Sequence, residues 1–565
     1  MKRKHDVFFG IAVLLITVMF TVAGCNIAIG SDKNTDPSGG YTDPVDVTTD
    51  PIAVTGVSLD KTTGELYMKT TTTLTATVVP ANAANKAVTW STSAPGVATV
   101  AGGIVTPVAT GEAIITVTTV DGGKTAACTL TVYNPIDIGD QAGLVTIGAS
   151  PANMGKSYKL TGDIAISAPI GLASGDIPFT GDFDGNGKTI TLNITSGLTV
   201  SNGSYTGTFA GLFAVVGEMS GNAGIRGTVY DLTVAGAINV SGVTVFAGGV
   251  AGVTTPSAAI RNVASSVNVS ANGSGDVYAG GIVGASQGVV SNVSATGNVS
   301  ASGAGNVHAG GILGVSQNAV SIVYAAGNIS ATASGAESAH AGGIVGTAQG
   351  AVSHAYTTGD VTATGNDDVL AGGIAGTGTV NNVYTTGNVS ATTGGNTASA
   401  YAGGIVGTGA VSYAYATGSI SASGTGTGEG VGENKATIGA GGISGASTNK
   451  PVRYTVALNS AVGVTGNNYN YCSYRITSTS GGDVVTNGAN NYGKGDLTPT
   501  GGSYTPPMHT GADKEDGMDV TVTGGPLPTP YTAPSQTWWT GTGFYGADWN
   551  TVWQWDTATG LPKLR

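Results

Sequence analysis

The sequence predicts an all-β protein in which a small β-sandwich is followed by a parallel β-helix with coils of about 30 residues. Three observations predict this fold class: a six-residue phrase that recurs every 30 to 38 residues, a second phrase that follows each copy, and an aliphatic position shared by all copies. The first phrase is AGGIVG or a close variant, and it begins at Ala247, Ala279, Ala309, Ala341, Ala371, Ala402 and Ala440.

The second phrase accounts for the rest of each unit. It runs SNVSATGNVS from Ser291 and NNVYTTGNVS from Asn381. Small or β-branched residues alternate with polar ones between Gly, Asn and Ser, which is typical of short strands separated by turns. A unit of this length with three short strands is one coil of a parallel β-helix, with coils about 4.8 Å apart.

The fourth residue of the first phrase is β-branched in every copy, as Ile344 is, whereas the fifth varies between Val345, Ala375 and Ser444. We therefore expect the fourth residue to point inward in a stacked aliphatic ladder. We expect the fifth, one residue along the strand, to tolerate a polar side chain. Glycines on either side let the backbone bend or approach closely.

Composition and charge agree with a packed solenoid. The 565 residues include 94 glycines and only 10% charged residues, but 41% are hydrophobic and the period is strict, which argues against disorder. The net charge is −12, and no Lys or Arg lies between Arg261 and Lys435. This stretch cannot follow a phosphate backbone, so a nucleic-acid partner is excluded.

The amino terminus indicates export. Three basic residues at 2–4 precede an apolar run at 7–20, which is too short for a stable membrane span and is typical of a signal peptide. The run ends in Val22-Ala23-Gly24-Cys25, which resembles a bacterial lipobox. The resemblance implies a lipoprotein signal peptide at 1–24 and acylation of Cys25; the alternative is an ordinary signal peptide with a chance cysteine. Residues 25–51 are rich in Ser, Thr, Asp, Gly and Pro and are expected to form a flexible tether.

Residues 52–133 carry short alternating runs interrupted by Pro80, Pro95 and Asp121-Gly122-Gly123, which predicts the small sandwich. The segment resembles the bacterial Ig-like domain of group 2, through Val57-Ser58-Leu59, Pro80-Ala81-Asn82-Ala83, Val88-Thr89-Trp90-Ser91 and Val97-Ala98-Thr99-Val100 among others. The resemblance implies an Ig-like β-sandwich of a kind used as a spacer or adhesive module on bacterial surfaces. Trp90 is interpreted as its buried aromatic residue. Cys128 and Cys472 are interpreted as buried free thiols, with a disulfide between them as the alternative.

The repeat region, residues 135–470, resembles the GLUG motif of large bacterial surface and secreted proteins. AGGIVG followed by SYAYATGSIS-like text carries this likeness, and the segment from Pro169 resembles the first coil that often precedes such motifs. The resemblance implies architecture and supplies no catalytic residues.

Calcium has candidate ligands in two parts of the sequence. Asp182, Asp184 and Asn186 match the first half of an EF-hand loop, but the twelfth position is Asn193 instead of Glu, and a tight turn explains the same letters. Acids also precede several copies of the first phrase, where stacking would bring them to one edge, either to share calcium or simply as solvated loop tips; they are Asp276, Glu337, Asp367, Asp368, Glu429 and Glu433. No cofactor is otherwise expected.

Two further registers collect aromatic residues. His308 and His340 both directly precede the first phrase, where packing is favoured over metal binding because a third ligand is missing. In the second phrase four tyrosines share one register and form either a structural ladder or an exposed stripe for sugars or protein; they are Tyr324, Tyr356, Tyr384 and Tyr415.

The carboxy-terminal segment, residues 471–565, is predicted to be a long loop that leads into an aromatic cap. Five of the six tryptophans lie there, and they would either cover the open end of the solenoid or bind sugar; they are Trp538, Trp539, Trp549, Trp553 and Trp555.

These features predict a non-enzymatic, membrane-anchored lipoprotein of the cell surface or outer membrane, with a role in adhesion or envelope structure. The expected partners are the membrane, through the lipid anchor, and a glycan or a host or matrix protein. The alternative is a β-helix polysaccharide lyase or glycosidase, which would need clustered carboxylates or a base in a groove.

Overall fold

The computed structural model describes residues 51–425 except 69, 172–176, 202–204, 219–226 and 397, then 437–446, 451–466, 470–474 and 476, and the strand segments 492–493, 518–519, 521–522, 525–526, 553–556 and 561–564. The chain divides into two units, 1–52 and 53–565, and the second is described here. Cys25, the signal peptide, Glu429, Glu433 and three of the terminal tryptophans lie outside the described residues.

The amino-terminal part of the second unit is a β-sandwich, as the sequence predicts. Its sheets have the orders β2-β9-β8-β5, β3-β7-β6 and β1-β4. Leu66, Ile115 and Leu130 lie in its core with Trp90 packed against them, and Cys128 is buried and free. The strands are β1 (Gly56–Leu59), β2 (Thr63–Tyr67), β3 (Thr72–Thr73), β4 (Ala76–Val79), β5 (Val88–Thr92), β6 (Ala98–Ala101), β7 (Ile104–Pro107), β8 (Gly111–Thr119) and β9 (Thr125–Tyr133).

The β-helix begins with a short helical segment. The Asp140 carboxylate accepts a hydrogen bond from the Gly143 N–H at 2.8 Å and caps the first helix, while Leu144 and Met154 are buried in the solenoid core. The segment and the first coils comprise β10 (Ile136–Ile138), α1 (Gln141–Thr146), the 3₁₀ helix Ile147–Ala149, α2 (Pro151–Met154), β11 (Tyr158–Leu160), β12 (Ile164–Ile166), β13 (Asp182–Asp184), β14 (Thr189–Ile194), β15 (Leu198–Ser201), β16 (Thr206–Ala210) and β17 (Phe213–Val216).

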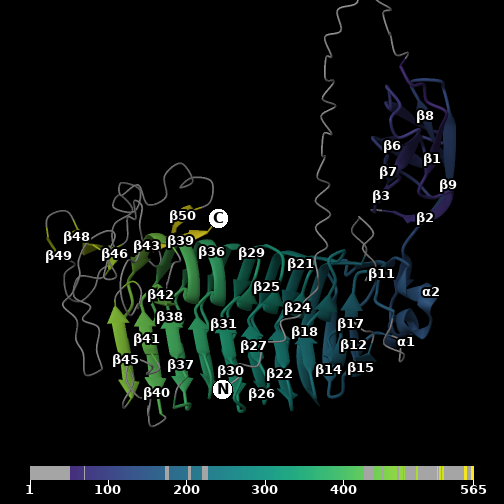
Figure 1. The fold of residues 1–565 in the computed structure, drawn as a ribbon. Helices are drawn as coiled ribbons and strands as arrows, with labels where there is room; N and C mark the ends of the chain where they lie inside the picture. The colour runs from purple at the N-terminus through teal and green to yellow at the C-terminus, as the bar shows by residue number, and fades with distance from the viewer. Residues whose placement is uncertain are drawn as a thin grey trace, which may run out of the picture. The chain divides into compact units, whose positions relative to one another are not determined.

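The repeats then form coils that stack in parallel (Figure 1). Their strands are β18 (Thr228–Gly242), β19 (Val245–Gly248), β20 (Ala251–Thr254), β21 (Ala259–Ser265), β22 (Asn268–Gly273), β23 (Val277–Gly280), β24 (Val283–Ser286), β25 (Val289–Ala295), β26 (Val299–Gly303), β27 (Val307–Gly310), β28 (Leu313–Ser316), β29 (Val320–Ala325), β30 (Ile329–Ala333), β31 (Ala339–Gly342), β32 (Val345–Ala348), β33 (Val352–Thr357), β34 (Val361–Gly365), β35 (Val369–Gly372), β36 (Ala375–Thr385), β37 (Val389–Thr393), β38 (Ala400–Gly403), β39 (Val406–Ala416), β40 (Ile420–Gly424), β41 (Thr437–Gly441), β42 (Ser444–Ala446), β43 (Val452–Ala457), β44 (Val462–Gly466) and β45 (Asn470–Tyr474).

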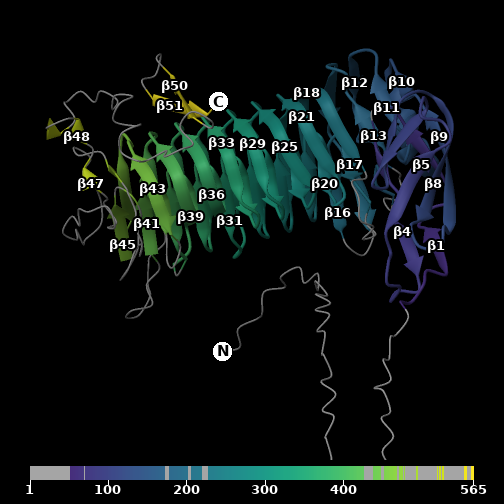
Figure 2. The same ribbon diagram turned by 90° about the horizontal axis from the view of Figure 1, so that it is seen from above.

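The coil at 277–303 contains four strands, β23 to β26, instead of the three expected. Each strand pairs in parallel with the equivalent strand of the next coil; Val283, for example, lies opposite Leu313. The first strand of each coil joins a 10-stranded sheet and the others a 28-stranded sheet (Figure 2). The parallel β-helix is therefore confirmed. The extra strand arises because the AGGIVG phrase spans a corner between two strands.

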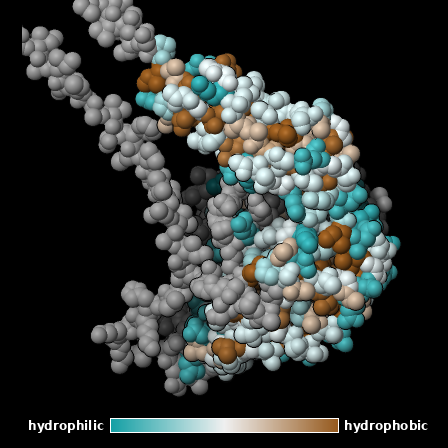
Figure 3. Space-filling model, turned by 90° about the vertical axis from the view of Figure 1, so that its right-hand side faces the viewer, coloured by the Kyte–Doolittle hydropathy of each residue, from teal (hydrophilic) through white to brown (hydrophobic). Residues whose placement is uncertain are grey.

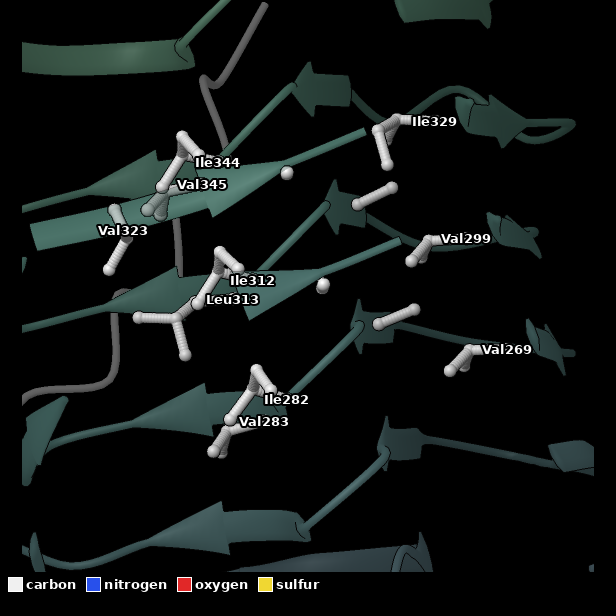
Figure 4. Packing of buried hydrophobic residues seen from close by; sticks show 14 of the residues in the cluster. Val269, Ile282, Val283, Val299, Ile312, Leu313, Val323, Ile329, Ile344 and Val345 are labelled. Atoms are coloured by element: carbon white, nitrogen blue, oxygen red, sulfur yellow. The ribbon is translucent and has the colours of Figure 1, made fainter. Parts of the chain in front are cut away.

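That corner corrects one prediction. Ile344 is fully buried as expected, but Val345 is fully buried too, and both point into the same core (Figure 4). Residues in one strand would alternate between faces, but the bend at Gly343 lies between the two strands and turns two successive side chains inward. A Cβ on Gly343 would overlap the carbonyl oxygen of Gly373 in the next coil, so only glycine fits this turn.

An asparagine ladder holds a second corner. In each case a side-chain oxygen accepts a hydrogen bond from the backbone N–H of the equivalent residue one coil further on, at 2.8 to 3.0 Å. The acceptors are Asn268, Asn298, Asn328, Asp360 and Asn388, and the last donor is Ser419. The triplet Asn298-Val299-Ser300, which has the pattern of a glycosylation site, belongs to this ladder.

The remaining described strands are β46 (Tyr492–Gly493), β47 (Met518–Asp519), β48 (Thr521–Val522), β49 (Gly525–Pro526), β50 (Trp553–Asp556) and β51 (Leu561–Leu564). In the part of the chain that the structure describes, no helix is long and apolar enough to cross a membrane. In the face drawn in Figure 3, hydrophobic residues are interspersed with hydrophilic and neutral ones.

Candidate binding groove on the solenoid

In eight successive coils, one residue at an equivalent strand position has a positive φ of 52° to 57°. We call this set the left-handed column; it comprises Asp231, Asn262, Asn292, Ile322, His354, Asn382, Tyr413 and Tyr454. Asn and Asp tolerate this conformation, whereas a β-branched residue such as Ile322 is strained there. Ile322 is nonetheless 58% exposed, so no burial of its side chain explains its presence.

Two residues further on lies a second set, the tyrosine column. Its successive members lie opposite one another in parallel register and are Thr233, Ala264, Ser294, Tyr324, Tyr356, Tyr384 and Tyr415. The four tyrosine rings stack with centroid distances of 4.4, 4.9 and 5.0 Å. The sequence predicted this shared register, and the structure shows that the rings form a mutual ladder. Whether the ladder also binds a ligand stays a prediction.

A groove of about 1050 Å³ is lined by the left-handed column from Asp231 to His354 and by the tyrosine column from Thr233 to Tyr356. It runs from Asp184 and Asn186 at one end to Tyr356 and Leu564 at the other. Five coil-to-coil steps separate Asp184 from Tyr356, or about 24 Å at the usual strand spacing. Among the described residues that line the groove there is no Lys or Arg, whereas Asp184 and Asp231 supply negative charge.

The carboxy-terminal hairpin, β50–β51, covers the far end of the tyrosine column (Figure 2). Trp553 is fully buried against Tyr384 and Tyr415, and its Nε1–H donates a hydrogen bond to Asn382 Oδ1 at 3.3 Å. The Tyr415 hydroxyl donates to the Pro562 carbonyl oxygen at 2.6 Å. This hairpin is the described part of the predicted cap. It packs on the side of the solenoid, over coils that precede the last strands, and not across the open end.

Burial in the stack raises the pKa of two of the tyrosine hydroxyls. Loss of solvent raises the pKa of Tyr384 above its usual range, and the neighbouring Tyr356 and Tyr324 raise it further. Burial also raises the pKa of Tyr356. These hydroxyls stay protonated near neutral pH and act as hydrogen-bond donors and acceptors.

The calcium candidates lie at the near end of the groove. The Asp184 carboxylate accepts a hydrogen bond from the Asn186 N–H at 2.8 Å, and the Asn186 side-chain amide donates to the Leu160 carbonyl oxygen. Asn186 and Gly187 have positive φ, so these letters do form a tight turn. Asp182 is held by Ser157, and burial raises its pKa. Calcium binding here stays a prediction.

The histidines lie in an aromatic column on another face. Phe209, Phe246, Tyr278, His308 and His340 have successive centroid distances of 4.8 to 5.2 Å. Both imidazole Nδ1 atoms lie within 2.9 Å of the Thr347 hydroxyl oxygen. Burial lowers the pKa of His340 to about 4 and also lowers that of His308, which His340 lowers further. Among the described residues, no group of three or more His, Cys, Asp or Glu side chains could hold a metal ion.

Two of the loop acids make structural contacts. Asp276 Oδ1 accepts a hydrogen bond from the Asn306 N–H at 2.8 Å, and Asp368 Oδ1 accepts one from the Ser399 N–H at 3.3 Å. Asp276 and Asp368 precede strands in one register, and each joins its coil to the next one.

Sequence reasoning missed the left-handed column. Its signal was present, because Asp231, Asn262 and Asn292 share a register two residues before the tyrosine column. Ile322, Tyr413 and Tyr454 hide the pattern, since a hydrophobic residue gives no sign of a left-handed conformation. Leu564 was also missed, because nothing local links it to a strand more than 200 residues earlier.

The comparisons with known proteins concern the sandwich. Residues 53–130 match the family model of the bacterial Ig-like domain (group 2). Over 80 residues the chain is 45% identical to an Ig-like virion protein of Serratia phage KSP90, and the match covers 14% of this chain and 31% of that protein. The chain thus spans about a third of the length of this relative.

Among solved structures, a candidate immunoglobulin A1 protease from Bacteroides ovatus is 15% identical, with 76% of this chain and 92% of that chain covered. Its TM-score of 0.28 is too low to support an argument about fold or activity. The likeness of the repeats to the GLUG motif stays a resemblance. The resemblance of the sandwich is confirmed: residues 53–130 are a group 2 bacterial Ig-like domain.

Proposed function

We propose that the chain is a bacterial surface lipoprotein that binds a surface partner through the groove of its β-helix without transforming that partner. Cys25 would carry the lipid, residues 25–51 would act as the tether, and the Ig-like domain would act as the spacer. Several acyl chains on one cysteine, at about 0.8 kcal/mol per buried methylene, suffice for stable anchoring to a membrane.

The groove is the observation that supports this proposal. Carboxylates, amides and tyrosine hydroxyls follow one another along the groove from coil to coil, so a long partner would meet many weak contacts. The Ig-like domain adds support, since it is similar to an Ig-like virion protein and a virion protein belongs to a particle.

Asp182 and Asp184 favour a second candidate function, cleavage of a polysaccharide. Asp184 lines the groove, and burial raises the pKa of Asp182, as a general acid requires. The Asp184 oxygen that accepts the Asn186 N–H is engaged in the turn, however, so we rank this function second.

Purified full-length protein in detergent would be applied to arrays of glycans and matrix proteins. Tyr324→Ala combined with Tyr356→Ala should remove binding, whereas Tyr278→Ala, in the aromatic column outside the groove, should not. Equal binding by all variants would refute the role of the groove. Release of shortened polysaccharide that stops in both Asp182→Asn and Asp184→Asn would replace the proposal with the enzyme.

A further inference from the structure

Within the tyrosine column, the stack of tyrosine rings ends inside the groove, at Tyr324. Beyond Tyr324 the same register continues with Ser294, Ala264 and Thr233, whose small side chains fill little of the height that a ring would occupy. These three positions extend over about 14 Å at the strand spacing. All three line the groove with Tyr324, so the space beside them belongs to the same cavity.

Tyr324 is the ring at which the stack ends. One of its faces packs on Tyr356 at 4.4 Å, and its other side is directed towards the coil of Ser294. At the opposite end of the column, the Trp553 ring packs against Tyr384 and Tyr415. Trp553 lies at nearly equal distance from both rings, 6.2 and 6.3 Å, and is tilted by 44° to each, so it covers the side of the stack and leaves the Tyr324 end to the groove.

A polar row accompanies the empty stretch. The Asn292 amide donates a hydrogen bond to Asn262 Oδ1 at 2.5 Å, and the Asn262 amide donates to Asp231 Oδ1 at 2.9 Å. All three side chains are exposed and line the groove. The row ends in a carboxylate, and its amides and oxygens suit hydroxyl groups, which both donate and accept hydrogen bonds.

We propose that this stretch is a subsite for a neutral saccharide chain, with one sugar ring stacked on Tyr324 beside Ser294 and its hydroxyls bonded to Asn262, Asn292 and Asp231. This assignment rests on the proposed function and names the partner's chemical class. A sugar ring has an apolar face that suits an aromatic ring and a hydroxylated rim that suits the polar row.

Charge and hydrogen bonding separate this ligand from others. An anionic polymer would meet Asp184 and Asp231 with no Lys or Arg among the described lining residues. An extended peptide would need unpaired strand edges, but β21, β25 and β29 are each paired on both sides by neighbouring coils. Neither alternative fits the groove as well as a neutral sugar.

The test uses Ser294→Tyr in the full-length protein, since the new ring would continue the stack onto Tyr324 and fill the subsite. Ser300→Tyr is the matched control, because Ser300 is an exposed serine of the same coil on β26, outside the groove. The probes are fluorescent hexasaccharides of glucose, mannose and N-acetylglucosamine, with a galacturonic acid hexasaccharide as the anionic probe and an extended hexapeptide as the peptide probe. Binding is measured by fluorescence anisotropy.

We expect at least one neutral probe to bind, with a Kd that rises about 10-fold or more in Ser294→Tyr and in Tyr324→Ala and stays unchanged in Ser300→Tyr. Unchanged circular dichroism would show that the variants are folded. Absence of binding to all neutral probes, preference for the anionic or peptide probe, or equal affinity in Ser294→Tyr and Ser300→Tyr would overturn the assignment. If Ser294→Tyr still binds the surfaces that the wild type binds on the arrays, the subsite is refuted while the proposed function stands.

Discussion

Ile322 offers the sharpest test of how the groove is built, because Asn in its place should make the protein more stable. The residue has φ of 57° and 58% exposure, and it follows Asn292 in the left-handed column. Ile322→Asn would introduce the residue type that the two preceding coils have at this position, Asn262 and Asn292. The new amide could donate to Asn292 Oδ1, as Asn292 donates to Asn262.

The magnitude follows from three contributions. A left-handed conformation costs a residue with a Cβ roughly 1–2 kcal/mol, most of which Asn avoids by bonding locally. An added hydrogen bond contributes about 0.5–1.5 kcal/mol. Against these, full burial of Ile is worth roughly 1.5–3 kcal/mol, and with 58% of the side chain exposed less than half of this is lost. The expected gain in the free energy of unfolding is therefore about 1 kcal/mol.

Urea unfolding monitored by circular dichroism measures this gain. Val289→Asn is the matched control, since Val289 is a β-branched residue with 46% exposure and no positive φ. It should lose stability by about 0.5–1 kcal/mol, because Asn is disfavoured in a strand and no strain is relieved. Destabilisation of Ile322→Asn to the same extent as Val289→Asn would refute the argument from strain.

Three further predictions follow. Wild-type protein should partition into the detergent phase and incorporate labelled palmitate, whereas Cys25→Ser should do neither; equal aqueous partitioning of both would rule out the anchor. Ile344→Asp and Val345→Asp should each destabilise the solenoid by several kcal/mol in urea unfolding, because both bury an unpaired charge. As a control, Thr362→Asp on the exposed side of β34 should cost well under 1 kcal/mol. A tolerated Val345→Asp would contradict the corner geometry. Because folding lowers the pKa of His340 from 6.5 to about 4, the folded state binds fewer protons than the unfolded state between these values. The stability that His340 contributes is therefore full above pH 6.5 and falls by about 3 kcal/mol as the pH falls towards 4. His340→Leu, which introduces the residue type found at Leu370 in the next coil, should make the free energy of unfolding in urea differ less between pH 4.5 and pH 7. An unchanged difference would show that the imidazole is not the cause.

The fold was predictable because stacking repeats the same demands in every coil. The fourth position of the first phrase is β-branched in every copy, which indicates from the sequence alone that it faces the core, and Ile344 is indeed buried. The register of Tyr324 and Tyr356 was likewise visible, since in-register coils bring equivalent residues together. The group 2 Ig-like domain was carried by its own local residues.

The features of the structure that were not predictable depend on geometry that the local sequence pattern does not reveal. Val345 is buried because a corner interrupts strand alternation. Ile322 gives no sign of its left-handed backbone. Trp553 lies 171 residues from its partner Asn382, so no periodicity could connect the hairpin with the groove. Prediction of the groove would have required knowing that the left-handed column and the tyrosine column lie next to each other on the outside of the solenoid.

Ladders in a solenoid have a property that bears on function. Inside a ladder, each ring is covered on both faces by its neighbours, as Tyr356 is by Tyr324 and Tyr384. Such rings stabilise the stack and offer a ligand only their edges and hydroxyls. At the end of a ladder, one side of the last ring is directed towards small residues. Because the coils beyond it are spaced like stacked rings and carry small side chains, they leave room for a further ring. Ligand recognition in this chain is therefore expected at Tyr324, where the stack of tyrosine rings ends, more than along the stack. The terminal hairpin covers the part of the same column around Tyr384 and Tyr415.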